Sequence, residues 1–401
     1  MASNSLAPEG GFAGRDATVQ RLLLQLPQWR EVTHPGSHKV LSALEKCHTA
    51  ALGCHVYRCS DSDCGAMHYQ YHSCRNRHCP SCGGSKREAW IEARMKELLP
   101  VKYYHIVFTL PHQLNPLVMG NRKALFDLLM EAASYTLLTF AGDARYLGAT
   151  PGIIMILHTW GQTLSFHPHV HCIVSGGGIG KAGKWREALK AKHHYLFPDK
   201  ALAVVYRAYF LKHLQRLVDK GVVSMSDEQH RQWLTLRSSL YQQPWITYCK
   251  APFGGPAQVV EYLGRYTHKV AISNGRITKI DAQNKVTFRY KDYAEEGKQK
   301  EMTLCGEEFL RRFEQHILPP RYCKIRHYGY LANRGRRGRV NGILEQLQLP
   351  QHPEPRQVSA VIRLIEQRGH EGLVCPVCGK ATLALLYVCD SGGRRKEVLR
   401  E

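Results

Sequence analysis

The sequence contains no uninterrupted apolar run near the roughly 18 residues that a membrane-spanning helix requires. Its first residues, MASNSLAPEGGFAGRDATVQ, lack the basic start, apolar stretch and small-residue cleavage site of a secretory signal. No internal repeat is evident. These absences argue against a membrane protein, an exported protein and a repeat array, and we expect a soluble cytoplasmic protein.

Acidic residues are in short supply. Asp and Glu together number 33 against 55 for Lys and Arg, a net charge of +22 in a chain of 401 residues. Such a surplus favours a polyanionic partner such as DNA, although a merely basic enzyme would also show it. The length is sufficient for a sizeable core and predicts two or three domains.

The cysteines are clustered. Seven of the fourteen lie between Cys47 and Cys82, and Cys375, Cys378 and Cys389 lie near the C-terminus. Because the cytosol keeps thiols reduced, clustered cysteines there bind metal more often than they form disulfides. The pattern therefore predicts structural zinc.

Two knuckle-like units suggest the ligands of one zinc ion: Cys59, Cys64, Cys79 and Cys82. A different choice of four, or a second ion, stays open because further candidates lie in the same segment. These additional candidates are Cys47, Cys54, His55, Cys74 and His78. CPVCG at 375–379, with Cys389 and His370, has the spacing of half a zinc site.

The hydrophobic periodicity predicts an α+β fold with a predominantly antiparallel sheet. Helices are expected from residue 19 to Pro27 and at 85–100, 122–142, 199–221 and 256–270, and strands from residue 103 and at 152–160, 169–177, 285–293 and 322–329. The expected organisation is a disordered tail at 1–18, a zinc-binding domain with flanking helices at 19–100, a main domain at 101–345, and a linker with a small cysteine-containing segment at 346–401.

The segment HPHVH at 167–171 is a candidate divalent-metal site. On a strand, His169 and His171 point to one face while Val170 points to the other. Two imidazoles leave positions for a third ligand, for which Gln162 in the preceding turn is the candidate, and for substrate oxygens. Strand histidines are also often only hydrogen-bonded, and His158 is interpreted in that way.

Two tyrosines, Tyr262 and Tyr266, stand four residues apart in EYLGRYTHKV. On a helix this spacing places both phenols on one face, where either hydroxyl can approach one phosphate, although tyrosines so spaced also commonly line a core or groove. A basic Gly-rich run supplies candidate contacts to the DNA backbone, with a solvated tail as the alternative. Its arginines are Arg334, Arg336, Arg337 and Arg339.

Four segments occur in the order SCRNRHCPSC, YYHIVFTLP, HPHVHCIVSGGG and EYLGRYTHKVAIS. Over residues 20–345 the chain resembles rolling-circle transposases of the insertion-sequence ninety-one type, which are two-tyrosine members of the HUH endonuclease superfamily. The resemblance implies that His169 and His171 bind Mg²⁺ or Mn²⁺, that Tyr262 and Tyr266 are nucleophiles forming 5′-phosphotyrosine intermediates, and that the N-terminal cysteines bind zinc.

The substrate that the resemblance implies is single-stranded DNA at transposon ends and target sites. Three other functions remain compatible with the residues: a plasmid replication initiator or relaxase with the same chemistry, a zinc-dependent DNA-binding regulator without nuclease activity, and a hydrolase that uses the histidines and an activated water.

Overall fold

The computed structural model describes residues 17–82, 94, 97–188, 196–249, 258–259, 270–351, 374–380 and 382–397. Its helices are α1 Val19–Gln25, α2 Trp29–Val32, α3 Pro35–Glu45, α5 Asn115–Gly120, α6 Arg122–Gly142, α7 Asp199–Asp219, α8 Asp227–Gln242, α10 Gly306–Glu314 and α11 Arg336–Gln346. Its strands are β1 Cys54–Cys59, β2 Met67–Tyr71, β3 Tyr103–Thr109, β4 Thr150–Trp160, β5 Phe166–Ile179, β6 Trp185–Glu187, β7 Thr247–Cys249, β8 Ile277–Ile280, β9 Val286–Asp292, β10 Lys298–Leu304, β11 Ile325–Gly329, β12 Leu383–Cys389 and β13 Arg395–Glu397.

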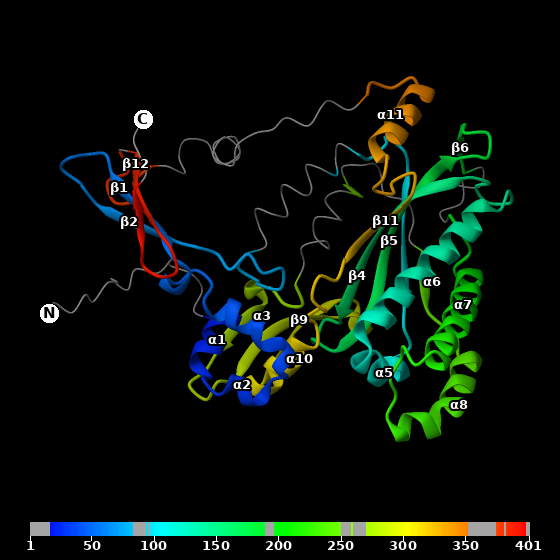
Figure 1. The fold of residues 1–401 in the computed structure, drawn as a ribbon, viewed down its shortest axis with the longest axis horizontal. Helices are drawn as coiled ribbons and strands as arrows, with labels where there is room; N and C mark the ends of the chain where they lie inside the picture. The colour runs from blue at the N-terminus through cyan, green and yellow to red at the C-terminus, as the bar shows by residue number, and fades with distance from the viewer. Residues whose placement is uncertain are drawn as a thin grey trace.

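The largest sheet has the strand order β11-β4-β5-β3-β7, with β6 paired to β5. All of its pairings are antiparallel. Helix α6 packs against β4, β5 and α7, so that these helices cover one face of the sheet (Figure 1). The predicted α+β class with an antiparallel sheet is confirmed.

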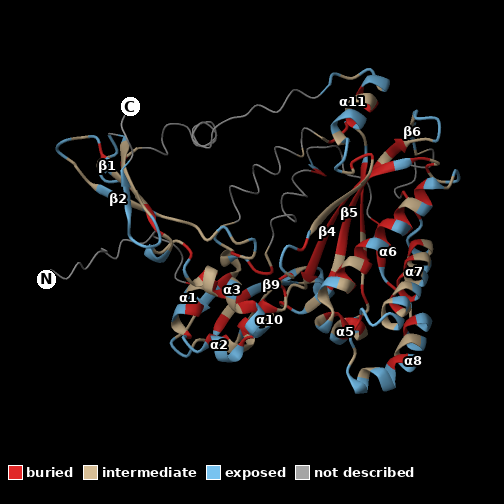
Figure 2. Ribbon diagram, in the orientation of Figure 1, coloured by how far each residue is buried: buried red, intermediate tan, exposed pale blue. Residues whose placement is uncertain are grey.

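Alternation along the strands separates the two faces of this sheet. Val170, Cys172 and Val174 of β5 belong to the large core beneath α6 and α7, whereas Ile173 belongs to a smaller core on the opposite side. The buried residues concentrate where β4 and β5 meet α6 (Figure 2). Since successive side chains of a strand point to opposite faces, the odd-numbered residues of β5 look away from the helices.

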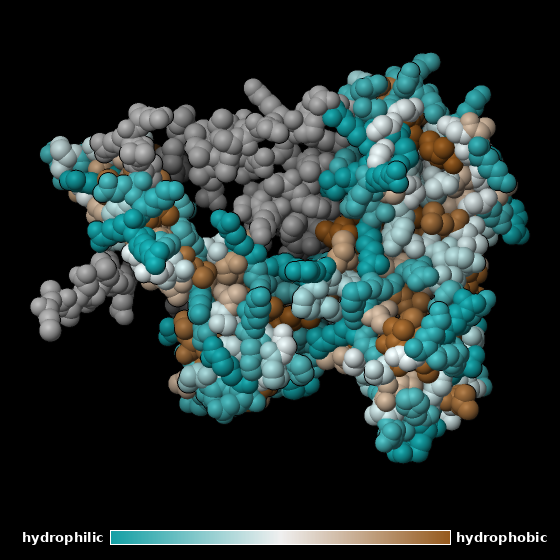
Figure 3. Space-filling view, in the orientation of Figure 1, coloured by the Kyte–Doolittle hydropathy of each residue, from teal (hydrophilic) through white to brown (hydrophobic). Residues whose placement is uncertain are grey.

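Helix α6 spans the predicted residues 122–142. By length and hydropathy it is the one described helix able to cross a membrane, and 67% of its most apolar window is buried inside the protein. On the face that Figure 3 shows, hydrophobic side chains form small scattered patches among hydrophilic ones. Helix α6 is therefore the central helix of a core.

A second unit joins distant parts of the chain. Helices α1 to α3 pack with the sheet β10-β9-β8 and with α10 around one core that includes Trp29 and Phe309. Thr18 accepts a hydrogen bond from the Arg21 N–H and thereby caps α1. Pro35 occupies the first turn of α3, where its missing N–H costs nothing.

The third unit is a small sheet with the strand order β13-β12-β1-β2. Strand β12, from the C-terminal part of the chain, pairs antiparallel with β1 from Cys54↔Cys389 to Cys59↔Leu383. Figure 1 shows the C-terminal strand in red beside the blue N-terminal strands. The C-terminal cysteine-containing segment thus completes a sheet that begins near the N-terminus.

Several predicted features lie largely outside the described residues: the tail at 1–18 and the helices at 85–100 and 256–270; residues 352–373 of the linker and segment predicted at 346–401 also lie outside them. Helix α11, by contrast, lies within the described chain and begins inside the basic run, at Arg336.

Candidate metal and catalytic centre

Three histidine rings converge on the sheet face that α6 and α7 leave uncovered. His158, near the end of β4, pairs directly with His169 of β5, and His171 lies two residues further along β5. One ring nitrogen from each histidine lies within 4.8 Å of the other two. Three imidazoles so placed are able to bind one divalent ion and leave further coordination positions open.

Hydrogen bonds fix which ring nitrogens face the centre. His169 Nδ1 donates to the carbonyl oxygen of His167 at 2.7 Å. His171 Nδ1 lies 2.9 Å from Nε2 of His105. The Nε2 atoms of His169 and His171 therefore turn toward each other, 3.1 Å apart. A ligating imidazole commonly anchors its second nitrogen in this manner, which sets its tautomer and orientation.

His105 supports the triad without belonging to it. It lies on β3, diagonally across from His171 in the β3–β5 ladder, and is only 3% exposed. Its ring stacks on that of His171 with centroids 5.1 Å apart and an interplanar angle of 11°. His105 is therefore placed to orient His171.

The surroundings favour neutral imidazole. Burial lowers the pKa of His169 to about 4, so its ring is uncharged at neutral pH, the form that binds metal. Trp160 stacks on His158 with centroids 4.5 Å apart. The same Trp160 lines a cavity of about 370 Å³ that Arg77 and Lys324 also line.

The structure does not place Gln162 as the third ligand. Its side-chain amide donates to the Tyr293 hydroxyl at 3.3 Å and accepts from the Lys291 N–H at 3.5 Å. His158, interpreted from sequence as an ordinary strand histidine, brings a third ring nitrogen beside those of His169 and His171. The hairpin register brings it opposite His169, while the turn directs Gln162 toward β9.

The two candidate nucleophiles, Tyr262 and Tyr266, lie outside the described residues. Their role remains the expectation drawn from the sequence.

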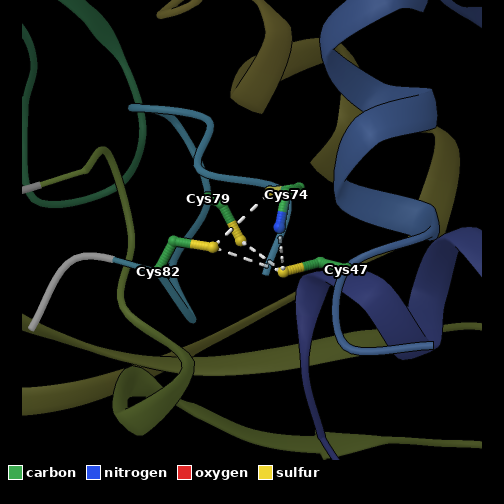
Figure 4. A group of neighbouring side chains, drawn as sticks. All are labelled: Cys47, Cys74, Cys79 and Cys82. Atoms are coloured by element: carbon green, nitrogen blue, oxygen red, sulfur yellow. Dashed lines mark hydrogen bonds between the residues drawn. The ribbon is translucent and has the colours of Figure 1, made fainter. Parts of the chain in front are cut away.

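Cys47, Cys74, Cys79 and Cys82 form one compact thiol group (Figure 4). The Cys82 sulfur lies 3.3 Å from that of Cys47 and 3.5 Å from that of Cys74, and the Cys79 and Cys47 sulfurs are 3.6 Å apart. Hydrogen bonds among these thiols, first of all with Cys47, lower the pKa of Cys82 and raise that of Cys79. Four sulfurs at these distances fit a tetrahedral zinc ion.

The zinc ligands proposed from sequence therefore need correction. Cys79 and Cys82 belong to the group just described, whereas Cys59 and Cys64 lie beside Cys375 and Cys378 in a second group. Sequence spacing could not show this division, because it depends on the pairing of β1 with β12.

The remaining zinc candidates are placed elsewhere. His55 Nδ1 lies 3.0 Å from His72 Nε2, and Cys54 faces Cys389 across the strand pair. His78 Nε2 accepts a hydrogen bond from the Leu318 N–H at 3.3 Å. His370 lies outside the described residues.

The arginines of the basic run differ in their surroundings. Arg336 forms an ion pair with Glu97 at 2.8 Å, and the Arg339 guanidinium donates to the Tyr330 carbonyl at 2.9 Å. Arg334, Arg337 and Arg339 are exposed, and Arg336 is half-buried.

Two family models match the chain. A model described as "Transposase zinc-binding domain" matches residues 20–110, and one described as "Putative transposase" matches residues 152–338. The first contains the complete Cys47 group and the second contains the histidine triad.

Two relatives carry the same designation. The "Putative transposase y4qJ" of Sinorhizobium fredii is 38% identical over 362 residues, covering 88% of this chain and 89% of that protein. The transposase for insertion sequence element IS801 of Pseudomonas savastanoi is 33% identical over 294 residues, covering 72% of this chain and 68% of that protein.

A solved structure of TrwC complexed with a 27-mer DNA is 12% identical, covers 39% of this chain and 73% of that one, and has a TM-score of 0.22, which is too low to indicate a shared fold. The sequence matches, together with the zinc-binding module and the sheet body, define the protein as a transposase. The chain belongs to the family of insertion-sequence ninety-one type transposases.

Proposed function

We propose that this transposase nicks and rejoins single-stranded DNA through phosphotyrosine intermediates on Tyr262 and Tyr266, beside a divalent metal held by His158, His169 and His171. The observation that carries the proposal is the convergence of three imidazole nitrogens within 4.8 Å on the sheet face opposite α6 and α7. The reaction would drive rolling-circle transposition of the element.

The donor set suits a transition-metal ion. Imidazole nitrogens bind such ions readily, whereas Mg²⁺ prefers oxygen ligands, so Mn²⁺ is the better candidate of the two. Such a cation, when bound, stabilises negative charge on the nonbridging oxygens of the scissile phosphate. His105 keeps the Nε2 atom of His171 directed at the centre through the contact at His171 Nδ1.

The tyrosine supplies the nucleophile. A bond forms between its phenolic oxygen and phosphorus while the bond from phosphorus to the 3′ oxygen breaks. The phenol loses its proton and the departing oxygen gains one, leaving a 5′-phosphotyrosine and a free 3′-hydroxyl. Because the covalent link conserves the phosphodiester energy, a hydroxyl can reverse the step without ATP, and two tyrosines permit two linked cleavages.

The charge of the chain supports a DNA substrate. The net charge of +22 favours binding to the phosphate backbone, with affinity that falls as salt rises. Arg334, Arg336, Arg337 and Arg339 of the basic run are the proposed backbone contacts. A bacterial transposase acting on DNA would work in the cytoplasm.

The family's zinc-binding domain is proposed to hold one structural ion through Cys47, Cys74, Cys79 and Cys82. Four thiolates leave no open coordination position, so this ion would stabilise the fold and take no part in chemistry. Since Cys47 and Cys79 belong to the core around Trp29, the ion would stiffen the unit formed by α1 to α3.

The experiment that tests the proposed chemistry scores covalent protein–DNA adducts on denaturing gels. Labelled single strands spanning the element's ends are incubated with protein and Mn²⁺ or Mg²⁺. We expect an adduct in the wild type that disappears in the Tyr262→Phe/Tyr266→Phe double variant. The single variants rank the two nucleophiles, and His230→Ala, an exposed histidine of α8, serves as the control that keeps activity.

Other outcomes would support the rival functions. DNA binding without any adduct would indicate a regulator, and cleavage that persists in the double tyrosine variant would indicate a hydrolase that uses water. Adduct formation only at a replication origin would indicate an initiator or relaxase.

A further inference from the structure

The two ends of the described chain meet in one small sheet. Beyond the β1–β12 pairing, the Ser60 N–H donates to the Thr382 carbonyl at 2.9 Å, and Val374 forms an isolated bridge with Thr382. These contacts bring the turn that follows β1 next to the turn that precedes β12. Cys59 ends β1 and Cys64 lies in the turn after it, while Cys375 and Cys378 lie in the turn before β12.

Those cysteines, Cys59, Cys64, Cys375 and Cys378, form the second thiol group, and all four sulfurs lie within 4.8 Å of one another. The Cys59 and Cys378 sulfurs are 3.7 Å apart, and those of Cys64 and Cys375 are 3.9 Å apart. Each close pair takes one thiol from each end of the chain. Each segment contributes only two of these four thiols, so neither segment alone completes this site.

Both turns have the local geometry of metal-binding knuckles. Gly65 and Gly379 adopt φ values of +51° and +66°, a conformation that glycine tolerates best. The Gly379 N–H donates to the Cys375 carbonyl at 2.8 Å. His68 Nε2 of β2 lies 3.4 Å from the Cys375 sulfur and is placed to donate to a thiolate.

Gly53 is an independent indication that the N-terminal segment is adapted to close contact with the C-terminal strand. A Cβ atom at this position would lie 2.2 Å from the Cys389 carbonyl oxygen and 2.8 Å from the Asp390 carbonyl carbon. Because both are backbone atoms, no side-chain rearrangement can relieve the overlap. The N-terminal segment thus carries the residue type that the approach of the C-terminal strand requires.

We propose that Cys59, Cys64, Cys375 and Cys378 bind a second structural zinc ion, which fastens the C-terminal strands to the N-terminal zinc-binding domain. Four thiolates in a reducing compartment are a ligand set typical of structural zinc. The site extends the zinc-binding domain beyond the matched residues 20–110. The folding of that domain would then depend on a segment that begins more than 260 residues after residue 110.

The test counts zinc per chain by elemental analysis of protein purified in reducing buffer without chelator. We expect one zinc ion fewer per chain in Cys375→Ser/Cys378→Ser than in the wild type, a difference that zinc bound at the histidine triad leaves unchanged. Cys389→Ser lies in the same C-terminal strands but outside both thiol groups, so it should retain the wild-type zinc content. Cys378→His should also retain it, because histidine is an ordinary zinc ligand.

A second measurement asks whether the C-terminal segment stays bound to the rest of the chain after cleavage between them. Its main comparison uses the wild-type sequence with and without chelator. A specific protease site is inserted between Gln351 and Val374, and the purified protein is cleaved. We expect the C-terminal fragment to stay with the rest of the chain, to be released by a strong chelator, and to be released without chelator in Cys375→Ser/Cys378→Ser.

Three results would overturn the proposal. The first is a single zinc ion in the wild type that persists in Cys375→Ser/Cys378→Ser. The second is a chelator-resistant C-terminal fragment. The third is a free-thiol titration that finds these four cysteines oxidised, together with no zinc at the site. That result would mean that disulfides join the two segments.

Discussion

Replacing His105 with phenylalanine tests the hydrogen bond that orients the triad. Phenylalanine retains an aromatic ring beside His171 but removes the nitrogen that lies 2.9 Å from His171 Nδ1. With Nε2 directed at the metal, Nδ1 of His171 carries the hydrogen, which would lose its acceptor in a site only 8% exposed. Losing such a supporting contact typically weakens metal binding by about 10- to 100-fold.

That loss corresponds to roughly 1.4 to 2.7 kcal/mol of binding free energy, at 1.36 kcal/mol for each factor of ten. An unsatisfied buried donor also destabilises the fold by about 1–3 kcal/mol. Mn²⁺ affinity is measured by calorimetric titration, and unfolding free energy by urea denaturation of the same preparation without Mn²⁺. Adduct formation in His105→Phe should recover at high Mn²⁺ concentration.

Ile106→Val is the matched control. Ile106 is the next residue of β3, faces the core beneath α6 and α7, and is fully buried. Its substitution should cost about 0.5–1.5 kcal/mol of stability and leave the Mn²⁺ affinity unchanged. If His105→Phe binds Mn²⁺ as tightly as the wild type, the supporting role of His105 is refuted.

Three further predictions concern stability. Burial and nearby Arg77 lower the pKa of Lys324 from 10.5 to about 7. Between pH 7 and pH 10.5 the unfolded state therefore binds more protons than the folded state, so the free energy of unfolding rises with pH. Urea denaturation at pH 7 and pH 10 should show that Lys324→Met lacks this part of the rise. Gly152→Ala would place a Cβ atom 2.5 Å from the Tyr330 ring and should cost about 1–3 kcal/mol, whereas Gly338→Ala in α11 meets nothing within 4 Å and should stabilise by about 0.5–1 kcal/mol. Cys47→Ser should lose the zinc of its group and lower the melting temperature, while the exposed Cys305→Ser should do neither.

Local patterns predicted much of the central unit. The α6 boundaries follow from an uninterrupted helical pattern, and the shared orientation of His169 and His171 follows from strand alternation. His158 was missed because its role depends on pairing between strands. Strand alternation alone gives no signal for this pairing: with Trp160 opposite Phe166, a regular antiparallel register would place His158 opposite Pro168, and the irregularity between His158 and Trp160 brings it opposite His169 instead.

The cysteine groups could not be assigned from spacing. Cys59 and Cys64 take their partners from residues more than 300 positions away, through a strand pairing that no local pattern specifies. The core around Trp29 could not be predicted from spacing either, because it combines the first helices with α10 and the sheet β10-β9-β8. Non-local pairing decides both arrangements, and sequence periodicity reports only on local structure.

The central claim is that a metal held by three histidines promotes attack by a tyrosine on DNA. The most direct test compares His158→Ala with Gln162→Ala for formation of the tyrosine-linked adduct in Mn²⁺, with the adduct peptide identified by mass spectrometry. We predict a phosphotyrosine at Tyr262 or Tyr266 in the wild type and in Gln162→Ala, and no adduct in His158→Ala even though it still binds the strand. A full yield of adduct in His158→Ala, or a nucleotide linked to any other residue, would contradict the account.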